Sequence, residues 1–391
     1  MHEPYRPTID PAAAGLDPVA LDTLRERIRR EVEAGLMPAA QMAFAVDGEL
    51  AVLEAFGDAD TATRFHVFSC TKALIAGVVW QLMAEGHLSP ETRAIELVPV
   101  LGTEGSTPER MAAVTLEHLL THTAGFPAAP LGPPDWETSE GRLKALARWH
   151  APYEPGTYFE YHPTAAHWVV AAMIEAVEGR DFRQVVRERI IEPLGLRGFG
   201  LGEHERDDDI APLRIVGEPP SPEEIAEVFG TADHDIGEVT PALLLGLNDP
   251  AVRRVGIPGG GGVATAADLA LLYQALLHDP LGLWDPEILA DGTGNIRCRL
   301  PNPDTGVASN RTLGLIVAGD DGLASFRGMG PTVSPRAFGH NGAGGQIAWG
   351  DPATGVSFGF VTSGLDQNFI REAKRIASIA AKAGSCRPFD G

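Results

Sequence analysis

Strand-like segments lie at both ends of this chain, and helical patterns fill its middle. Two short apolar runs, 41–46 and 49–56, flank Asp47-Gly48, a pair typical of a hairpin turn. Near the other end three apolar segments resemble strands, the last two as a hairpin: 312–317, 338–349 and 356–362. We therefore expect an α/β protein of the α+β type, with an antiparallel sheet formed by the N- and C-terminal segments and flanked by helices.

The middle of the chain is expected to form an inserted, mainly helical lobe. We assign residues 1–86 and 259–391 to the sheet domain and residues 87–258 to this lobe. Residues 203–258 are acidic and proline-containing, which indicates a cap-like insertion over a cleft, and the run Glu203–Asp209 is expected to be a solvated loop. Apolar spacing and capping residues predict helices at 16–35, 165–178, 241–247 and 369–383.

Composition narrows the classes of function. The 391 residues carry a net charge of −22, which argues against nucleic acid or an anionic membrane surface as partner. No apolar run approaches the roughly 18 residues that span a membrane, and Met1–Pro18 lacks the pattern of a signal peptide. Three cysteines fit a reducing compartment. We expect a cytoplasmic protein acting on a small molecule; the oligomeric state stays open.

Ser69 and Lys72 lie three residues apart at the start of an apolar helical pattern. A β-like run ends at Phe68, and apolar residues recur at helical spacing from Leu74 to Met83, which predicts a buried helix. Ser69 then lies in the first turn, with Lys72 on the same side. Burial and the helix N-terminus lower the pKa of such a lysine, whose neutral amine can accept the proton of a serine nucleophile. Ser-x-x-Lys also occurs by chance on surface helices. In that alternative, Ser69 would only cap the helix and Lys72 would be solvated.

Two other patterns favour structural roles over ligand binding. His118 and His122 are spaced as zinc ligands on a helix can be, but the acidic residue of a His-Glu-x-x-His site is absent. Gly259–Gly262 lack the lysine and the spacing of a nucleotide-binding loop, so they indicate tight backbone packing near the cleft. Asn310-Arg311-Thr312 matches a glycosylation sequon, which we attribute to chance. We expect no metal and no cofactor.

Four sequence motifs are more informative together, in the order in which they occur, than any one of them alone. They are Phe68-Ser69-Cys70-Thr71-Lys72, Leu119-Leu120-Thr121-His122-Thr123-Ala124-Gly125, Pro155-Gly156-Thr157-Tyr158-Phe159-Glu160-Tyr161 and Gly339-His340-Asn341-Gly342-Ala343-Gly344-Gly345. Over roughly residues 15–380 the chain resembles the serine β-lactamase and penicillin-binding-protein superfamily. Within it, the sequence is most similar to class C β-lactamase-like enzymes and family VIII carboxylesterases.

The resemblance implies a role for each matching residue. Ser69 would be the acyl-accepting nucleophile, Lys72 would help to take its proton, and Tyr161 would pass that proton to the leaving group. His340, Asn341 and Gly342 would form the substrate-binding strand, and the N–H groups of Ala343 and Ser69 would form the oxyanion hole.

The sequence departs from the family pattern at two positions. The family often has Tyr-x-Asn where this chain has Pro163, which offers no side-chain donor, and His340 replaces a common lysine. His162 or His167 could compensate, and His162 and Trp349 are candidates for lining the substrate pocket. These changes favour esters over β-lactams or peptides.

We therefore predict a serine hydrolase that cleaves small or medium carboxylic esters through an acyl-enzyme on Ser69. Acyl transfer and amide or β-lactam hydrolysis would use the same residues, and the sequence does not separate them. A catalytically silent relative that only binds a ligand is a third alternative, against which the intact Ser69, Lys72 and Tyr161 argue.

Overall fold

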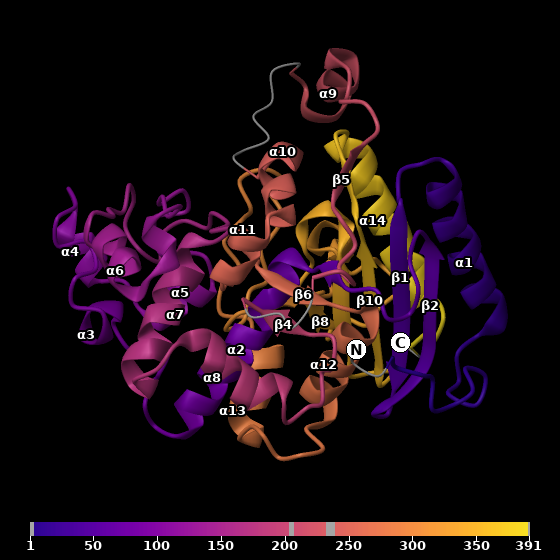
Figure 1. The fold of residues 1–391 in the computed structure, drawn as a ribbon, viewed down its shortest axis with the longest axis horizontal. Helices are drawn as coiled ribbons and strands as arrows, with labels where there is room; N and C mark the ends of the chain where they lie inside the picture. Colours follow the sequence, from indigo (N-terminus) through magenta and orange to yellow (C-terminus); the bar gives the residue numbers. More distant parts are fainter. Residues whose placement is uncertain (1–3, 203–206, 232–238, 390–391) are drawn as a thin grey trace.

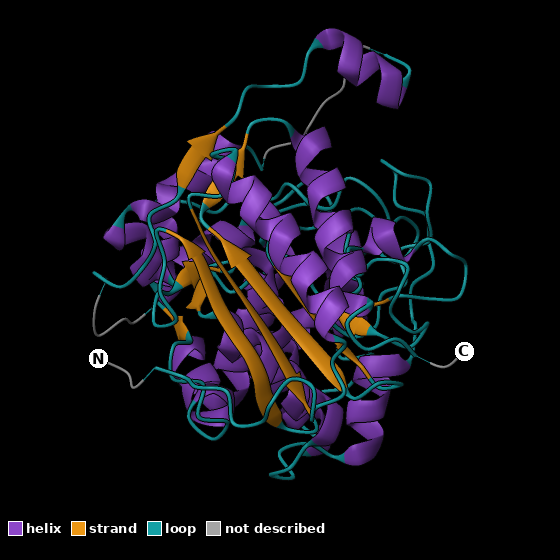
Figure 2. Ribbon diagram, turned by 90° about the vertical axis from the view of Figure 1, so that its right-hand side faces the viewer, coloured by secondary structure: helices purple, strands orange, loops and turns teal. Residues whose placement is uncertain are grey.

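The computed structural model describes residues 4–202, 207–231 and 239–389 and contains an antiparallel sheet with helices on both faces (Figure 1, Figure 2). The strand order is β2-β1-β10-β9-β8-β7, and every neighbouring pair is antiparallel. The strands are β1 (Ala39–Val46), β2 (Glu49–Gly57), β7 (Ile316–Val317), β8 (Phe338–Gly339), β9 (Ile347–Asp351) and β10 (Val356–Thr362). Since β1 pairs with β10, both ends of the chain build the sheet, which confirms the predicted fold class.

Two helices from opposite ends of the chain cover one face of the sheet. They are α1 (Pro18–Glu33) and α14 (Phe369–Gly384), which appear beside each other in Figure 1 in indigo and yellow. The core between them and the sheet contains alternate residues of β10, namely Val356, Phe358 and Phe360. This alternation is what a strand with two covered faces requires, because successive side chains point to opposite sides.

The other face of the sheet packs against α12 (Ala266–His278) and the larger core around α2 (Lys72–Ala84). Helix α2 is buried on nearly all sides, so the apolar pattern that predicts it describes a central helix and not a one-sided stripe. The remaining helices are α3 (Ala94–Leu97), α4 (Pro108–Ala112), α5 (Leu116–Leu120), α6 (Ser139–Ala147), α7 (Ala165–Glu178), α8 (Phe182–Val186), α9 (Pro222–Phe229), α10 (Pro241–Leu244), α11 (Pro250–Val255) and α13 (Pro286–Gly294).

Short strands connect the helical region to the sheet. β3 (Phe65–His66), β6 (Gly262–Ala264) and β4 (Gly200–Leu201) form a three-stranded sheet in the order β3-β6-β4. β5 (Arg214–Val216) pairs in parallel with β11 (Gly364–Asp366). The division of the chain into two domains stays a prediction. Of the predicted acidic loop, residues 203–206 lie outside the described part of the chain.

Two of the predicted strands are shorter than expected. The segment 312–317 forms a strand only at β7, because Gly314 adopts a φ of +105° in a turn where Thr312 N–H donates to Leu315 O. The segment 338–349 is interrupted by a 3₁₀ turn at Ala343–Gly345, with Gly344 at a φ of +69°. In both segments, therefore, a glycine adopts a backbone conformation with positive φ that residues with side chains rarely adopt.

The sheet positions the segment that carries Ser69. Gly359 of β10 lets α12 approach closely, because a Cβ at this position would overlap the carbonyl oxygen of Ala266. Strand β6 leads directly into α12 and pairs with β3, and Gly262 O accepts a hydrogen bond of 3.0 Å from Val67 N–H. The turn that contains Ser69 is thus held to the sheet through α12. In the described residues, no helix is long and apolar enough to cross a membrane.

Candidate active site

Ser69 lies in a 3₁₀ turn, Phe68–Thr71, immediately before α2. The preceding Phe68 adopts a φ of +45°, which is uncommon for a bulky residue and typical of a tightly constrained functional turn. Thr71 Oγ1 stabilises the turn by donating to Phe68 O at 2.6 Å and accepting from Gly262 N–H at 3.0 Å. The turn leaves Ser69 partly exposed at the start of a buried helix.

Lys72 is fully buried, and three oxygen atoms lie within hydrogen-bond distance of its side-chain nitrogen. Nζ lies 2.8 Å from Pro163 O, 2.6 Å from Gly259 O and 3.1 Å from Ser69 Oγ. Among the described residues, no carboxylate forms an ion pair with Lys72. Burial lowers the pKa of Lys72 below its ordinary value, and the nearby Arg311 lowers it further.

Tyr161 completes the group around the serine. Its hydroxyl lies 2.8 Å from Ser69 Oγ, and Lys72 Nζ lies 5.1 Å from the centre of its ring. The ring of His122 packs 4.5 Å from the ring of Tyr161, and His122 Nδ1 accepts a hydrogen bond of 3.2 Å from His162 N–H. His122 adopts a φ of +60° after α5 and positions the segment that carries Tyr161.

Glycines of the third motif and of the segment 259–262 also have a packing reason. Gly156 adopts a φ of +83°, and a Cβ at this position would lie 3.0 Å from His118 Nε2. Gly259 lies against Pro163, and Gly262 lies against Thr71. Both contacts agree with the tight packing that we expect for this segment. His118 and His122 act in packing and hydrogen bonding, and among the described residues no group of three or more metal-ligating side chains could hold a metal ion.

Four neutral histidines surround Tyr161 and Lys72. Burial is the main reason that the pKa values of His122, His167 and His340 lie well below the ordinary value, and burial also lowers the pKa of His162 to about 4. His162 Nδ1 donates to Glu160 O at 2.6 Å, and its Nε2 accepts from Phe126 N–H at 3.2 Å, which fixes a neutral tautomer. These rings provide a polar but uncharged support for the site.

The 340–343 segment lies beside Ser69. A Cβ at Gly342 would overlap the carbonyl oxygen of Val67, so only glycine allows the two backbones to approach so closely. The rings of His340 and Tyr161 are 6.1 Å apart. The Asn341 side chain turns away and donates to Gly328 O at 2.9 Å. Ala343 remains partly exposed at the next position along the chain.

Two candidates for lining the pocket lie in other places. The prediction for Trp349 is wrong, because this residue is 1% exposed and belongs to the core beneath α1 and α14. Its ring packs at a tilt against the ring of Phe358, with 5.7 Å between the ring centres. His162 is fully buried, and both of its ring nitrogens are bonded to the backbone, so it supports the site and does not face a substrate. His167 is also fully buried, and neither of its ring nitrogens has a hydrogen-bond partner within the described structure, so it does not replace the missing asparagine.

Arg311 also belongs to the site, although no sequence motif indicated it. Its guanidinium lies 5.3 Å over the Tyr161 ring and 5.5 Å over the Phe159 ring, and Nη1 lies 3.2 Å from His340 Nε2. The residue follows Asn310 in an irregular segment, and no local pattern distinguishes it from a surface arginine.

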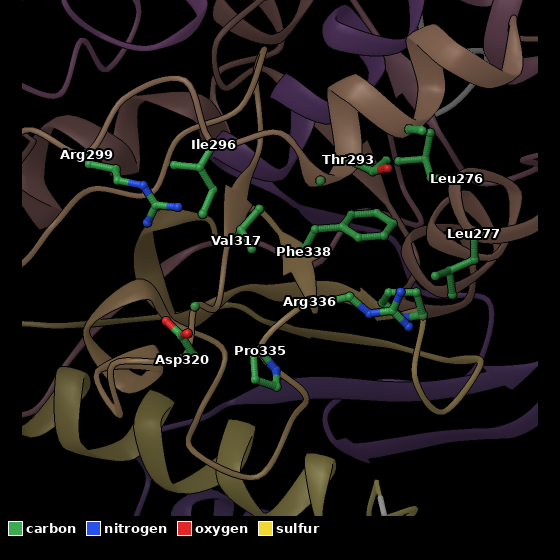
Figure 3. Close-up of a pocket in the computed structure, with 14 residues that line it drawn as sticks. Leu276, Leu277, Thr293, Ile296, Arg299, Val317, Asp320, Pro335, Arg336 and Phe338 are labelled. Atoms are coloured by element: carbon green, nitrogen blue, oxygen red, sulfur yellow. The ribbon is translucent and has the colours of Figure 1, made fainter. Parts of the chain in front are cut away.

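A separate cavity of about 440 Å³ lies between α12, α13 and the edge of the sheet (Figure 3). Figure 3 shows Phe338 and Val317 facing this space, with Arg299 and Arg336 toward its two ends. None of its lining residues is Ser69, Lys72 or Tyr161, so the cavity is distinct from the candidate active site.

The fold and this site define a class of protein. A Ser-x-x-Lys pair at the start of a buried helix, beside an antiparallel sheet and faced by a tyrosine, is the arrangement of the serine β-lactamase and penicillin-binding-protein superfamily. The family model described as Beta-lactamase matches residues 24–381. The chain belongs to this family. It is therefore a hydrolase of the serine β-lactamase family.

Individual relatives agree with this assignment. The chain is 30% identical over 322 residues to the esterase/beta-lactamase LipL of Mycobacterium tuberculosis, covering 76% of this chain and 69% of LipL. A penicillin-binding protein homologue from Caulobacter crescentus has 27% sequence identity and a TM-score of 0.73, with 95% of this chain and 99% of that chain covered. A family VIII carboxylesterase has the same fold, with 23% identity, a TM-score of 0.73 and coverage of 93% and 97%.

Proposed function

We propose that this protein cleaves small or medium carboxylic esters through an acyl-enzyme on Ser69. The observation that carries the proposal is the position of Lys72 Nζ between Pro163 O, Gly259 O and Ser69 Oγ. A neutral amine has two N–H donors and one lone pair. With both donors directed to the carbonyls, the lone pair faces the serine hydroxyl, as a general base must.

Acylation would begin with transfer of the Ser69 proton to Lys72. Ser69 Oγ then forms a bond to the acyl carbon, and the carbonyl oxygen takes up the negative charge. The N–H groups of Ser69 and Ala343 are the proposed donors to this oxyanion, and within the described residues neither donates to another protein atom. One such donor contributes about 3–4 kcal/mol to acyl transfer in comparable sites.

The leaving alcohol would receive its proton from Tyr161. Because the Tyr161 hydroxyl lies 2.8 Å from Ser69 Oγ, it is within reach of an oxygen bonded to the same acyl carbon. The bond between the acyl carbon and the leaving oxygen breaks as the phenol proton is transferred, and the Lys72 ammonium then returns a proton to Tyr161. A water molecule attacks the acyl-enzyme in the same way, which releases the acid and restores Ser69.

Two observations support esters over amides. LipL, the relative described above, is named as an esterase as well as a beta-lactamase. In this chain Pro163 occupies the place of the asparagine that the family often has after Tyr161, and its carbonyl is bonded to Lys72. No side-chain amide is therefore present at this position to bind the acyl-side carbonyl of a peptide or β-lactam.

The test compares wild type with Ser69→Ala. Wild type should hydrolyse p-nitrophenyl butyrate, react with a fluorophosphonate at Ser69 by peptide mapping, and hydrolyse a β-lactam or a phenylalanine amide much more slowly. Ser69→Ala should lose both labelling and turnover. Turnover that survives Ser69→Ala would refute the nucleophile. Faster cleavage of the amide or β-lactam would refute the ester preference, and an ester product formed with added alcohol would instead favour acyl transfer.

A further inference from the structure

Arg311 is a buried charged residue that has no carboxylate partner among the described residues. Its side chain is 8% exposed, and within the described residues it forms no ion pair with a carboxylate. Other buried arginines have such partners: Arg375 pairs with Asp366 and Glu31, and Arg327 with Asp321. Arg311 Nε lacks any hydrogen-bond partner in the described structure. A buried cation without an anion is costly, so a stable fold alone does not account for this residue.

His340 cannot supply the positive charge on this side of the site. Its Nδ1 lies 2.8 Å from Asn341 O and therefore carries the hydrogen, which leaves Nε2 as the acceptor for Arg311 Nη1 at 3.2 Å. Protonation of Nε2 would remove this bond and place two cations in contact. Burial accordingly holds the pKa of His340 well below its ordinary value, and burial lowers the pKa of Arg311 only to about 10, so Arg311 remains charged at neutral pH.

Tyr161 lies close to both basic side chains of the site. Arg311 is 5.3 Å and Lys72 Nζ 5.1 Å from the centre of its ring. In the proposed reaction the phenol O–H bond breaks, the proton goes to the leaving oxygen, and the bond between that oxygen and the acyl carbon breaks. Tyr161 is then a phenolate until the Lys72 ammonium returns a proton, and this transient anion is the negative charge that Arg311 faces.

We propose that Arg311 is a positioning residue that stabilises the Tyr161 phenolate during proton transfer to the leaving group. It supplies the charge that a lysine at position 340 would otherwise supply. This inference rests on the proposed acyl-enzyme function. Because Arg311 acts through Tyr161, its contribution should depend on how much the leaving group needs a proton.

The experiment compares two esters of one acid in Arg311 variants. Arg311→Met removes the charge and keeps an unbranched apolar stem, and Arg299→Met, at the edge of the separate cavity, is the control. We expect Arg311→Met to lower kcat for an ethyl ester by roughly 10²-fold, as loss of a unit charge about 5 Å away in a partly buried site implies. The loss should be much smaller for a p-nitrophenyl ester, whose leaving group departs without a proton. Arg299→Met should match wild type.

Restoring the charge provides the second measurement. Arg311→Lys should recover most of the ethyl-ester rate, and the double variant Arg311→Met with His340→Lys should recover part of it, because an ammonium then lies on the other side of the same contact. Equal losses for both esters, or no recovery with lysine at either position, would overturn the proposal and leave Arg311 a structural residue. Melting temperatures and fluorophosphonate labelling of each variant separate misfolding from the effect on proton transfer.

Failure of the ester assignment would not decide the role of Arg311. If wild type is labelled at Ser69 but prefers amides, the same variants are compared on an alkylamide and a p-nitroanilide, which differ in the same way in the basicity of the leaving group. The dependence on the leaving group then supports or overturns the proposal as before.

Discussion

Gly259→Ala tests whether the two carbonyls around Lys72 position it as a base. A Cβ at residue 259 would lie 2.7 Å from Pro163 O and 3.4 Å from Lys72 Nζ. The new methyl group would therefore separate Gly259 O from Pro163 O, the two acceptors of the Lys72 amine. Gly259 does not have a left-handed φ, so the backbone itself accepts alanine and the effect comes from the contact.

The size of the effect follows from these distances. To reach an ordinary contact of 3.4 Å, the Cβ and Pro163 O must separate by about 0.7 Å more than the 2.7 Å they have now. Since a misplacement of about 1 Å can cost 10²-fold in rate, we expect kcat/KM to fall by roughly 10–100-fold. Overpacking of this kind should also lower the free energy of unfolding by about 1–3 kcal/mol.

Gly260→Ala is the matched control. Its Cβ would lie 3.8 Å from the carbonyl carbon of Phe68, an ordinary contact, and its N–H would keep its bond to Ile257 O. It should keep wild-type kcat/KM and gain up to about 1 kcal/mol in stability from the less flexible unfolded chain. Ester hydrolysis and urea denaturation measure both quantities. If Gly259→Ala loses stability but keeps the full rate, the two carbonyls do not position the base, and the reasoning from Lys72 fails.

Two further predictions concern the same proton path. Because burial lowers the folded-state pKa of Lys72 below 10.5, the unfolded chain binds more protons between the lowered pKa and 10.5. The stability of wild type relative to Lys72→Met should therefore rise with pH through that window, as urea midpoints at pH 7 to 10 would measure; a flat difference would contradict it. Tyr161→Phe should lower kcat for an ethyl ester by about 10²–10⁴-fold and much less for a p-nitrophenyl ester. Equal losses in a paired assay would exclude Tyr161 as the acid.

Local patterns predicted the elements whose structure is local. α7 at Ala165–Glu178 and β10 at Val356–Thr362 have the predicted bounds, because the spacing of their apolar residues matches the faces that they bury. The segment 312–317 failed for a reason outside itself. A Cβ at Gly314 would lie 2.7 Å from Ala76 Cβ, so the close approach of α2 requires glycine in the turn that precedes β7.

The candidate site was predictable to the extent that its residues lie in sequence motifs. Ser69, Lys72 and Tyr161 belong to such motifs, and the structure places Lys72 Nζ 3.1 Å and the Tyr161 hydroxyl 2.8 Å from Ser69 Oγ. Trp349 was misplaced because the motif does not reveal which face of the sheet its side chain joins, and in β9 it packs into the core beneath α1 and α14. The place of Arg311 in the site could not be predicted from its sequence neighbours, because its contacts are with the rings of Phe159, Tyr161 and His340, which are distant in sequence.

The pairing of β1 with β10 has a consequence for biosynthesis. Val46 lies opposite Val356, so this pair cannot form until some 310 further residues (356 minus 46) have been made. At about 5–20 residues per second this takes roughly 15–60 s. During this time the apolar α2 segment cannot be buried against the complete sheet. A chain truncated before β10 would keep the Ser-x-x-Lys segment but should be insoluble. Chaperones that bind nascent chains should therefore affect the yield of folded protein more than the activity of each folded molecule.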